Sequence, residues 1–157
     1  MNTPAHGEVR LATVDDASAL AVLRYEFRAS SKPAVESAEE FLPRCIEWMR
    51  SRLADDARWR VWVFDHAGDV VGNVWLQLVE KLPNPNVDRE LHGYITNFYI
   101  RQEYRNGGAG SRMLRAALDE CGRSSVDTVF LWPTERSRPL YERHGFMPGN
   151  GILTQDL

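Results

Sequence analysis

Hydrophobic and polar residues alternate over several short stretches of the chain, and between these stretches apolar residues recur every three or four positions. Alternation of this kind predicts β-strands that are buried on one face, whereas a spacing of three to four predicts amphipathic helices. In chain order the pattern predicts a strand, two helices, a β-hairpin, a strand, a helix, a strand and a short helix.

The first third of the sequence predicts one strand, over residues 8–14, and two helices. Each helix follows a capping-box pattern, Thr13 with Asp16 for the first and Ser37 with Glu40 for the second. The apolar stripes of the two helices comprise Leu20, Leu23 and Phe27, and then Leu42, Cys45, Ile46, Met49 and Leu53.

The middle of the sequence predicts a hairpin and a further strand. Two β-rich runs, residues 58–64 and 70–79, are separated by five turn-forming residues that include a glycine. Prolines and asparagines over residues 81–90 predict a surface loop, and residues 92–100 return to a strand pattern. A glycine-rich turn then leads into a helix, for which Gly122 is well placed as the C-terminal cap.

The last strand is predicted over residues 126–132. It is apolar at nearly every position after Thr128, so we expect it to be buried on both faces. A short helix follows, with Ser137 as its cap, Pro139 in its first turn and Gly145 at its end.

Composition predicts one ordinary globular domain, residues 1–157, with no repeat or linker dividing it. The formal net charge is -3, with basic and acidic residues interspersed, which argues against a nucleic-acid-binding protein. No apolar run has the length of a signal peptide or a membrane span, so we expect a cytoplasmic protein. Cys45 and Cys121 are then expected to be free, buried thiols.

The stretch RNGGAG, residues 105–110, stands between a predicted strand and a predicted helix. Glycines there allow a phosphate to approach the first, unpaired N–H groups of the helix, so a pyrophosphate is the expected ligand. The stretch lacks the Lys-Ser/Thr of a P-loop and the third glycine of the dinucleotide fingerprint, so neither motif is present. From these residues alone, a turn with a purely geometric role stays open.

Two motifs carry a resemblance to a known family. RNGGAG resembles the Arg/Gln-x-x-Gly-x-Gly/Ala signature of the GNAT N-acetyltransferase superfamily, and LYERHGF, residues 140–146, is similar to the family's Leu-Tyr-x-x-x-Gly-Phe. The element order is also similar to the whole GNAT fold. The resemblance implies an α/β (α+β) protein with a central mixed, mostly antiparallel sheet, splayed at the cofactor site and flanked by about four helices.

The same resemblance implies acetyl-CoA as cofactor and acetyl transfer to a primary amine by direct attack in a ternary complex. Backbone groups of the strand before the loop would pair with the pantetheine, and the loop amides would hold the phosphates. The residues implicated are Phe98, Tyr99, Ile100, Arg105, Asn106, Gly107, Gly108, Ala109, Gly110, Ser111 and Thr134. Thr134 departs from the family pattern, because many members have an asparagine there.

Proton transfer has one candidate acid and several candidate bases. By resemblance, Tyr141 is the general acid that protonates the departing thiolate, although a tyrosine packed in the core is the structural alternative. Many family members place a glutamate on the central strands, where this chain is apolar. Glu80, Glu90 and His92 flank that region, and a chain of water molecules is a further route for the proton.

The amine substrate is not identified by the sequence. The resemblance points to the N-terminal helices and the central strand as its site, with Tyr25, Glu26, Trp48 and Asn97 as candidate lining residues, and Glu26 suits an ammonium group. A free amino acid, a polyamine, an aminoglycoside-like drug and a peptide N-terminus all fit. The resemblance leaves a homodimer open, and a module that binds acyl-CoA without turnover is the alternative function.

Overall fold

The computed structural model describes residues 6–55, 57–86, 89–149 and 151–156, which form a five-stranded sheet flanked by helices. The strands are β1 (Glu8–Leu11), β2 (Trp59–His66), β3 (Asp69–Glu80), β4 (Leu91–Ile100) and β5 (Val126–Phe130). The helices are α1 (Ala17–Ser31), α2 (Ala38–Ala54), α3 (Ala109–Arg123) and α4 (Arg138–Arg143), with short 3-10 helices η1 (Val14–Asp16) and η2 (Gln102–Tyr104). The strands lie in sequence order; the first four are antiparallel, and β5 is parallel to β4. The expected mixed, mostly antiparallel sheet is therefore confirmed.

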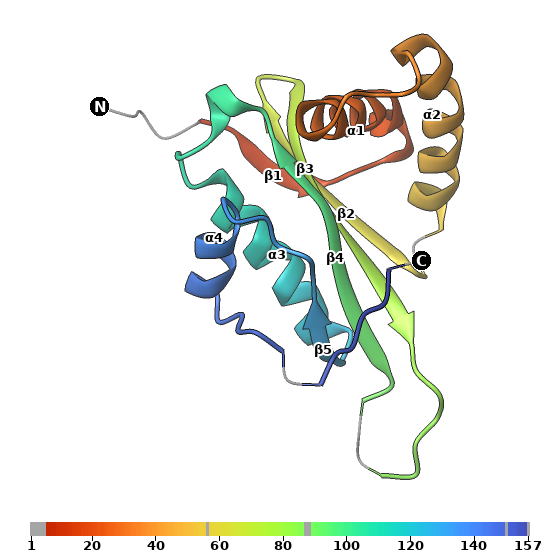
Figure 1. The fold of residues 1–157 in the computed structure, drawn as a ribbon, viewed down its shortest axis with the longest axis vertical. Helices are drawn as coiled ribbons and strands as arrows, with labels where there is room; N and C mark the ends of the chain where they lie inside the picture. Colours follow the sequence, from red (N-terminus) through yellow and green to blue (C-terminus); the bar gives the residue numbers. More distant parts are fainter. Residues whose placement is uncertain (1–5, 56, 87–88, 150, 157) are drawn as a thin grey trace.

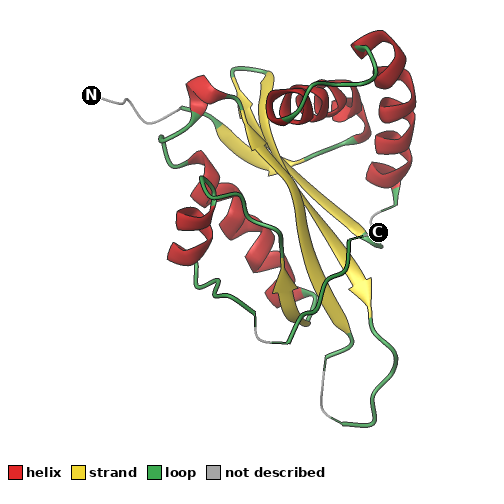
Figure 2. Cartoon of the chain, in the orientation of Figure 1, coloured by secondary structure: helices red, strands yellow, loops and turns green. Residues whose placement is uncertain are grey.

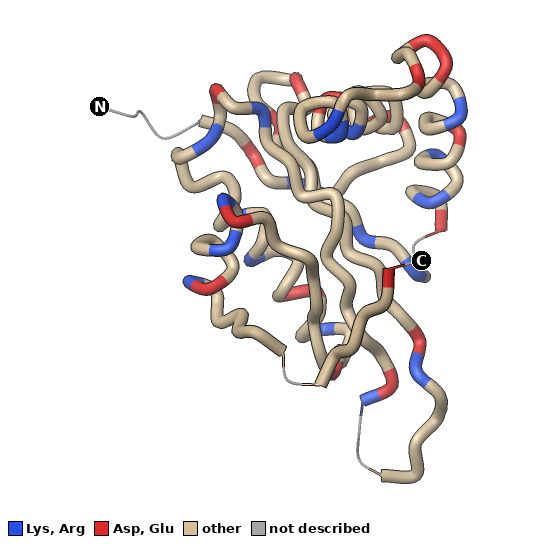
Figure 3. The backbone as a smooth tube through the Cα atoms, in the orientation of Figure 1, with Lys and Arg blue, Asp and Glu red and all other residues tan. Residues whose placement is uncertain are grey.

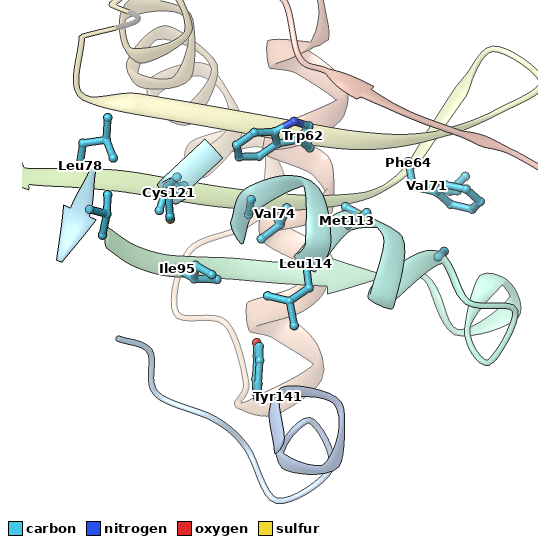
Figure 4. Close-up of a cluster of buried hydrophobic side chains, with 14 residues drawn as sticks. Trp62, Phe64, Val71, Val74, Leu78, Ile95, Met113, Leu114, Cys121 and Tyr141 are labelled. Carbon is cyan, nitrogen blue, oxygen red and sulfur yellow. The ribbon is translucent and has the colours of Figure 1, made fainter. Parts of the chain in front are cut away.

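The sheet separates two helical layers, with α1 and α2 on one side and α3 and α4 on the other (Figures 1 and 2). Each layer covers its own hydrophobic cluster. Under α1 and α2 lie Leu20, Leu23, Met49, Val63 and Trp75, whereas Phe64, Leu76, Ile95, Met113 and Leu114 belong to the cluster of α3 (Figure 4). The alternating faces of the strands thus supply both cores.

Both capping boxes form as predicted. The Asp16 carboxylate accepts the backbone N–H of Thr13 at 2.7 Å, and η1 continues directly into α1. At the start of α2, the Glu40 N–H donates to Ser37 Oγ at 3.3 Å, and the Ser37 N–H donates to the Glu40 carboxylate at 2.9 Å. These bonds pair backbone donors that the first turn of a helix would otherwise leave unsatisfied.

The hairpin is tighter than the sequence predicted. β2 and β3 extend into the expected five-residue turn, so that only Ala67 and Gly68 connect them. Both residues are in the left-handed region, with φ of 53° and 91°. Two consecutive left-handed residues are the requirement of a type I′ turn, whose twist matches that of the flanking strands.

Two predictions for α3 and the strand after it are wrong. Gly122 does not cap α3, because the helix continues to Arg123 and Ser125 supplies the left-handed residue, with φ of 55°. The last strand ends at Phe130 and is not buried on both faces, since Val129 and Phe130 are only partly buried and Trp132 is 64% exposed. Its aromatic residues instead pack against Tyr94.

Cys45 and Cys121 are both free and buried, as predicted. Burial raises the pKa of each thiol, that of Cys121 to about 11. Lys and Arg are interspersed with Asp and Glu along the described backbone (Figure 3). Within the described ranges, none of the helices combines the length and the apolar character that crossing a membrane requires.

Candidate active site

Strand β4 has no partner on its β5 side over the second half of its length. It pairs with β5 only from Leu91 to Tyr94, because β5 ends at Phe130. Beyond this point β4 continues to Ile100 while the chain after β5 turns away toward α4 (Figure 1). Among the described residues, no strand pairs with that edge of residues 95–100. The edge therefore offers backbone N–H and C=O groups to an extended ligand.

A β-bulge at Asn97 decides which side chains face this opening. Trp75 pairs with Thr96 and Asn73 pairs with Tyr99, so β4 has one extra residue, and Asn97 has a φ of 49°. Side chains beyond an extra residue of this kind point to the opposite face of the sheet from the one that strict alternation would give. As a result Phe98 packs toward α3, as Ile95 does three positions earlier.

The glycine-rich loop joins η2 to α3 through two left-handed residues, Asn106 with φ of 65° and Gly108 with φ of 85°. The N–H of Arg112 donates to the Gly108 carbonyl at 3.1 Å as the first bond of the helix. The N–H groups of residues 109–111 are therefore free of helical partners, as at any helix start. A Cβ at Gly110 would lie 3.4 Å from the side chain of Leu140, so the glycine brings α3 close to α4.

The loop, β4 and α4 enclose a cleft of about 340 Å³, which we call the loop cleft. Its lining comprises Phe98, Ile100, Arg105, Asn106, Gly108, Gly110, Ser111, Arg136, Ser137, Pro139, Leu140, Tyr141 and Arg143. The lining contains arginines but no Asp or Glu. Burial and the nearby Arg136 lower the pKa of Arg105, whose Nε donates to the Ile100 carbonyl at 2.7 Å. The loop cleft is thus suited to a phosphate-bearing ligand.

Tyr141 forms part of the inner wall of the loop cleft and is only 7% exposed. Its ring centroid lies 6.3 Å from that of Phe98 and 5.6 Å from that of Phe146, and its hydroxyl end points toward β4 and Leu114 (Figure 4). No hydrogen bond to this hydroxyl is formed by the residues that the structure describes. Burial raises the pKa of Tyr141 to about 12, so the hydroxyl keeps its proton at neutral pH.

The end of α4 holds Tyr141 in this position. The N–H of Phe146 donates to the Tyr141 carbonyl at 3.1 Å, and Gly145 is left-handed with φ of 87°, which closes the helix as predicted. Ser137 precedes the helix, but its side chain bonds to Thr134 and not to the helix, so the prediction of a side-chain cap is wrong.

The loop cleft brings together most of the cofactor-site residues proposed from the sequence, but four of them are not in its lining. The side chain of Tyr99 lies on the opposite face and stacks on Phe27, with ring centroids 5.3 Å apart. Ala109 is buried in the core, and Gly107 does not line the cleft. Thr134 is exposed, and its hydroxyl lies 2.9 Å from Ser137 Oγ.

A second cleft, of about 580 Å³, lies between the α1–α2 layer and the sheet, and we call it the aromatic cleft. It is lined by Arg24, Phe41, Arg44, Cys45, Trp48, Met49, Trp59, Trp75, Tyr94, Thr96 and Asn97. Trp48 and Asn97 were proposed from the sequence as substrate-site residues. Two other candidates lie elsewhere: Tyr25 donates its hydroxyl proton to the Glu36 carbonyl at 3.1 Å, and Glu26 forms an ion pair with Arg101 at 2.8 Å.

None of the candidate bases lines either cleft, although His92 is two residues from Tyr94 of the aromatic cleft on the same strand. Glu80 pairs with Leu91 at one end of the β3–β4 ladder, and Ile100 marks the other end, on the order of 30 Å away at the rise of an extended strand. Glu90 accepts the backbone N–H of Asn84 in the loop beyond that end. His92 packs against Phe130, with ring centroids 6.3 Å apart.

Several lining residues were missed by the sequence analysis. The cluster of arginines around Tyr141 in the sequence was an available signal for Arg136 and Arg143. No comparable local signal existed for Arg24, Trp59 and Trp75, because they come from α1, β2 and β3 and meet only in the folded protein.

Comparison with known proteins agrees with this geometry. Residues 23–146 match the model of the acetyltransferase (GNAT) family. The chain is 26% identical over 151 residues to the uncharacterized N-acetyltransferase YhfO of Bacillus subtilis (strain 168), covering 92% of this chain and 93% of that protein.

Solved structures show the same fold. A predicted acetyltransferase from Clostridium acetobutylicum, crystallised with acetyl-CoA, superimposes with a TM-score of 0.80 at 20% identity over 96% of each chain. A GCN5-related N-acetyltransferase from Ralstonia eutropha JMP134 has a TM-score of 0.78 at 24% identity, covering 96% of this chain and 98% of that one.

Proposed function

Because the chain belongs to the acetyltransferase (GNAT) family, we propose that it is an N-acetyltransferase that passes an acetyl group from acetyl-CoA directly to a primary amine in a ternary complex. Acetyl-CoA is the cofactor of this family. The observation that carries the proposal is the loop cleft, in which a glycine-rich helix start, three arginines and a buried tyrosine line one space.

The residues of the loop cleft fit acetyl-CoA. In our proposal the backbone N–H groups of residues 106–111 hold the pyrophosphate, and Arg136 and Arg143 balance its charge. The edge of β4 at Phe98 and Ile100 hydrogen-bonds the pantetheine arm through its free backbone groups, since the Ile100 carbonyl already accepts Arg105 Nε at 2.7 Å. When bound, acetyl-CoA supplies a thioester whose acetyl group an amine can accept.

Tyr141 is the proposed general acid. Its hydroxyl carries a proton throughout the neutral range, because burial raises its pKa to about 12. It lies in the wall of the loop cleft beside Phe98, next to the strand that would bind the pantetheine. Donating the Oη proton to the sulfur of the leaving group would prevent the build-up of a thiolate in an apolar surrounding.

Water is the proposed route for the proton of the amine. The linings of the loop cleft and the aromatic cleft contain no Asp, Glu or His among the described residues. Glu80, Glu90 and His92 lie toward the other end of β4. The amine therefore enters neutral or loses its proton to water, and a positive group such as Arg24 beside it favours the neutral form.

Calorimetry and a coupled assay test the proposal together. Acetyl-CoA, CoA and ATP are titrated into the protein, and thiol release from acetyl-CoA is then followed over a panel of amines. We expect acetyl-CoA and CoA to bind more tightly than ATP, and at least one amine to stimulate thiol release. Binding without release for any amine would indicate an acyl-CoA-binding module, and absence of binding would exclude both functions.

A further inference from the structure

Three partly buried arginines of the described chain, Arg24, Arg52 and Arg105, form no ion pair with a described carboxylate, and of these Arg24 alone lines the aromatic cleft. Arg10, Arg60 and Arg101 each have a carboxylate oxygen within 3.3 Å. Arg24 has no such ion pair with a described residue; its one side-chain hydrogen bond runs from Nη1 to Asn97 Oδ1, at 3.2 Å. Burial and the neighbouring Arg28 lower its pKa, so the surroundings disfavour the charge that it carries. An anion in the cleft would compensate this charge.

The surroundings of Arg24 are basic and contain no free carboxylate. Arg24 also lines an adjoining hollow with Arg28, Lys32 and Arg44. The one acidic residue in that lining, Glu36, is bound to Arg44 at 2.6 Å. Neither space contains a described carboxylate that is free to pair with a polycationic substrate. A substrate carboxylate, by contrast, could form an ion pair with Arg24.

The floor of the aromatic cleft is formed by Trp48, Trp59 and Trp75, whose ring centroids lie 5.7 to 5.8 Å from one another. Indole surfaces of this extent bind an apolar or aromatic body. A cage for a cation would need open ring faces, but Trp59 meets both other indoles edge to face, and the guanidinium of Arg52 lies 4.8 Å from the centre of the Trp48 ring. A neutral ring needs only one exposed indole surface, which Trp48, 42% exposed, provides.

Asn97 connects the two clefts. It holds Arg24 on the aromatic side, and the next residue, Phe98, lines the loop cleft beside Tyr141. A carboxylate on Arg24 would lie close to the bulge at Asn97, three residues beyond the last β4–β5 pair at Tyr94. An amine on the carbon next to that carboxylate would then be near the end of the proposed pantetheine channel.

We propose that the acceptor substrate is an aromatic α-amino acid, or an amine of equivalent chemistry, with its carboxylate on Arg24 and its ring on the indoles of the aromatic cleft. This assignment rests on the proposed acetyltransferase function and specifies its substrate class. It excludes polyamines and other polycationic amines as preferred acceptors.

Matched amines test the assignment on the wild-type protein. Phenylalanine and phenethylamine share the ring and a primary amine and differ by the carboxylate, whereas alanine keeps the carboxylate and lacks the ring. We expect kcat/KM for phenylalanine to exceed that for phenethylamine, alanine and spermidine by at least about tenfold, the effect of one charge-assisted contact. Phenethylamine or spermidine used as well as phenylalanine would overturn the assignment.

A substitution tests whether Arg24 makes this contact. Arg24→Gln keeps a donor for Asn97 and removes the charge, and Arg50→Gln removes an exposed charge on α2 outside both spaces as the control. We expect R24Q to raise KM for phenylalanine by roughly tenfold to a hundredfold and to change phenethylamine kinetics less than about twofold. R50Q should change both less than about twofold. An equal loss for both amines in R24Q would refute the role of Arg24.

Direct binding separates this inference from the proposed function. The indoles of the cleft report phenylalanine binding by fluorescence without any acetyl transfer, so this titration is informative even if the protein proves not to be an acetyltransferase. Phenylalanine should change the wild-type fluorescence in a saturable way, more weakly in R24Q, with folding checked by thermal melting. No saturable change in the wild type would overturn the assignment, whereas binding without turnover would count against the acetyltransferase function alone.

Discussion

The two clefts lie on opposite sides of β4 and are built from different parts of the polypeptide. The loop cleft depends on the backbone, through the amides at the start of α3 and the unpaired edge of β4. The aromatic cleft depends on side chains from α1, α2, β2, β3 and β4. A backbone site suits a ligand shared by a whole family, whereas a side-chain site can change with each substrate.

The largest effect is expected from a substitution that impairs the chemical step and leaves both clefts undisturbed. Tyr141→Phe keeps the ring contacts with Phe98 and Phe146 and removes the hydroxyl. We expect turnover to fall by about a hundredfold to ten-thousandfold, the usual contribution of a positioned acid, with the calorimetric Kd for acetyl-CoA unchanged.

Tyr104→Phe is the matched control, because Tyr104 is also partly buried but lies in η2 and packs against His66. It should retain full turnover. Should Tyr141→Phe do the same while chemistry limits the rate, Tyr141 is a packing residue only.

Replacing a glycine of the loop with a larger residue tests whether backbone groups of the loop cleft bind acetyl-CoA. At Gly110 a valine would place atoms beside Leu140 and in the cleft, so acetyl-CoA affinity should fall by roughly tenfold or more, the cost typical of overpacking. Gly108 is less informative, since its φ of 85° strains any other residue whether or not a ligand binds.

Gly122→Val on the same helix is the control, because a Cβ there would meet nothing within 4 Å. Its acetyl-CoA affinity should equal that of the wild type. Equal affinity in a folded Gly110→Val protein would place the cofactor elsewhere.

A smaller effect is expected from the charges around the loop. Arg136→Gln should weaken acetyl-CoA binding by roughly threefold to tenfold at low salt and by less at high salt, because an exposed charge is screened. Arg138→Gln, two residues away and outside the loop cleft, is the control and should bind normally. A loss that does not respond to salt would argue against an electrostatic role.

The smallest effect concerns stability at alkaline pH. Burial raises the pKa of Cys121 from 9.0 to about 11 and that of Tyr141 from 10.0 to about 12. The unfolded chain therefore ionises first, and stability is full below pH of about 9 and declines as the pH rises toward the folded values. Urea unfolding as a function of pH should show this decline, with a shallower slope above pH of about 10 in Tyr141→Phe. An identical slope would mean that Tyr141 ionises alike in both states.

The contrast between the clefts also explains how much the sequence could predict. The capping boxes at Thr13 and Ser37 and the left-handed glycine at 108 are local features, and the structure confirms the helices that they begin. The mixed sheet and its flanking helices were also anticipated, because the order of elements and two motifs resembled a known fold.

Features that depend on distant partners could not be predicted. The apolar run after Thr128 suggested a buried strand, but its position at the sheet edge follows from pairing with β4 alone. Glu26 suggested a site for an ammonium group until the fold brought Arg101 to it. Arg24 could not be identified from the sequence, because both its lack of a described carboxylate partner and its place beside the indoles depend on the fold.

Amide hydrogen exchange with and without saturating acetyl-CoA tests the central claim most directly, because it reports on the backbone groups themselves. We expect slower exchange in residues 95–100 and 106–111 when acetyl-CoA is bound, with α1 and α2 unchanged. Protection confined to α1 and α2, or none in the glycine-rich loop while acetyl-CoA is bound, would contradict it.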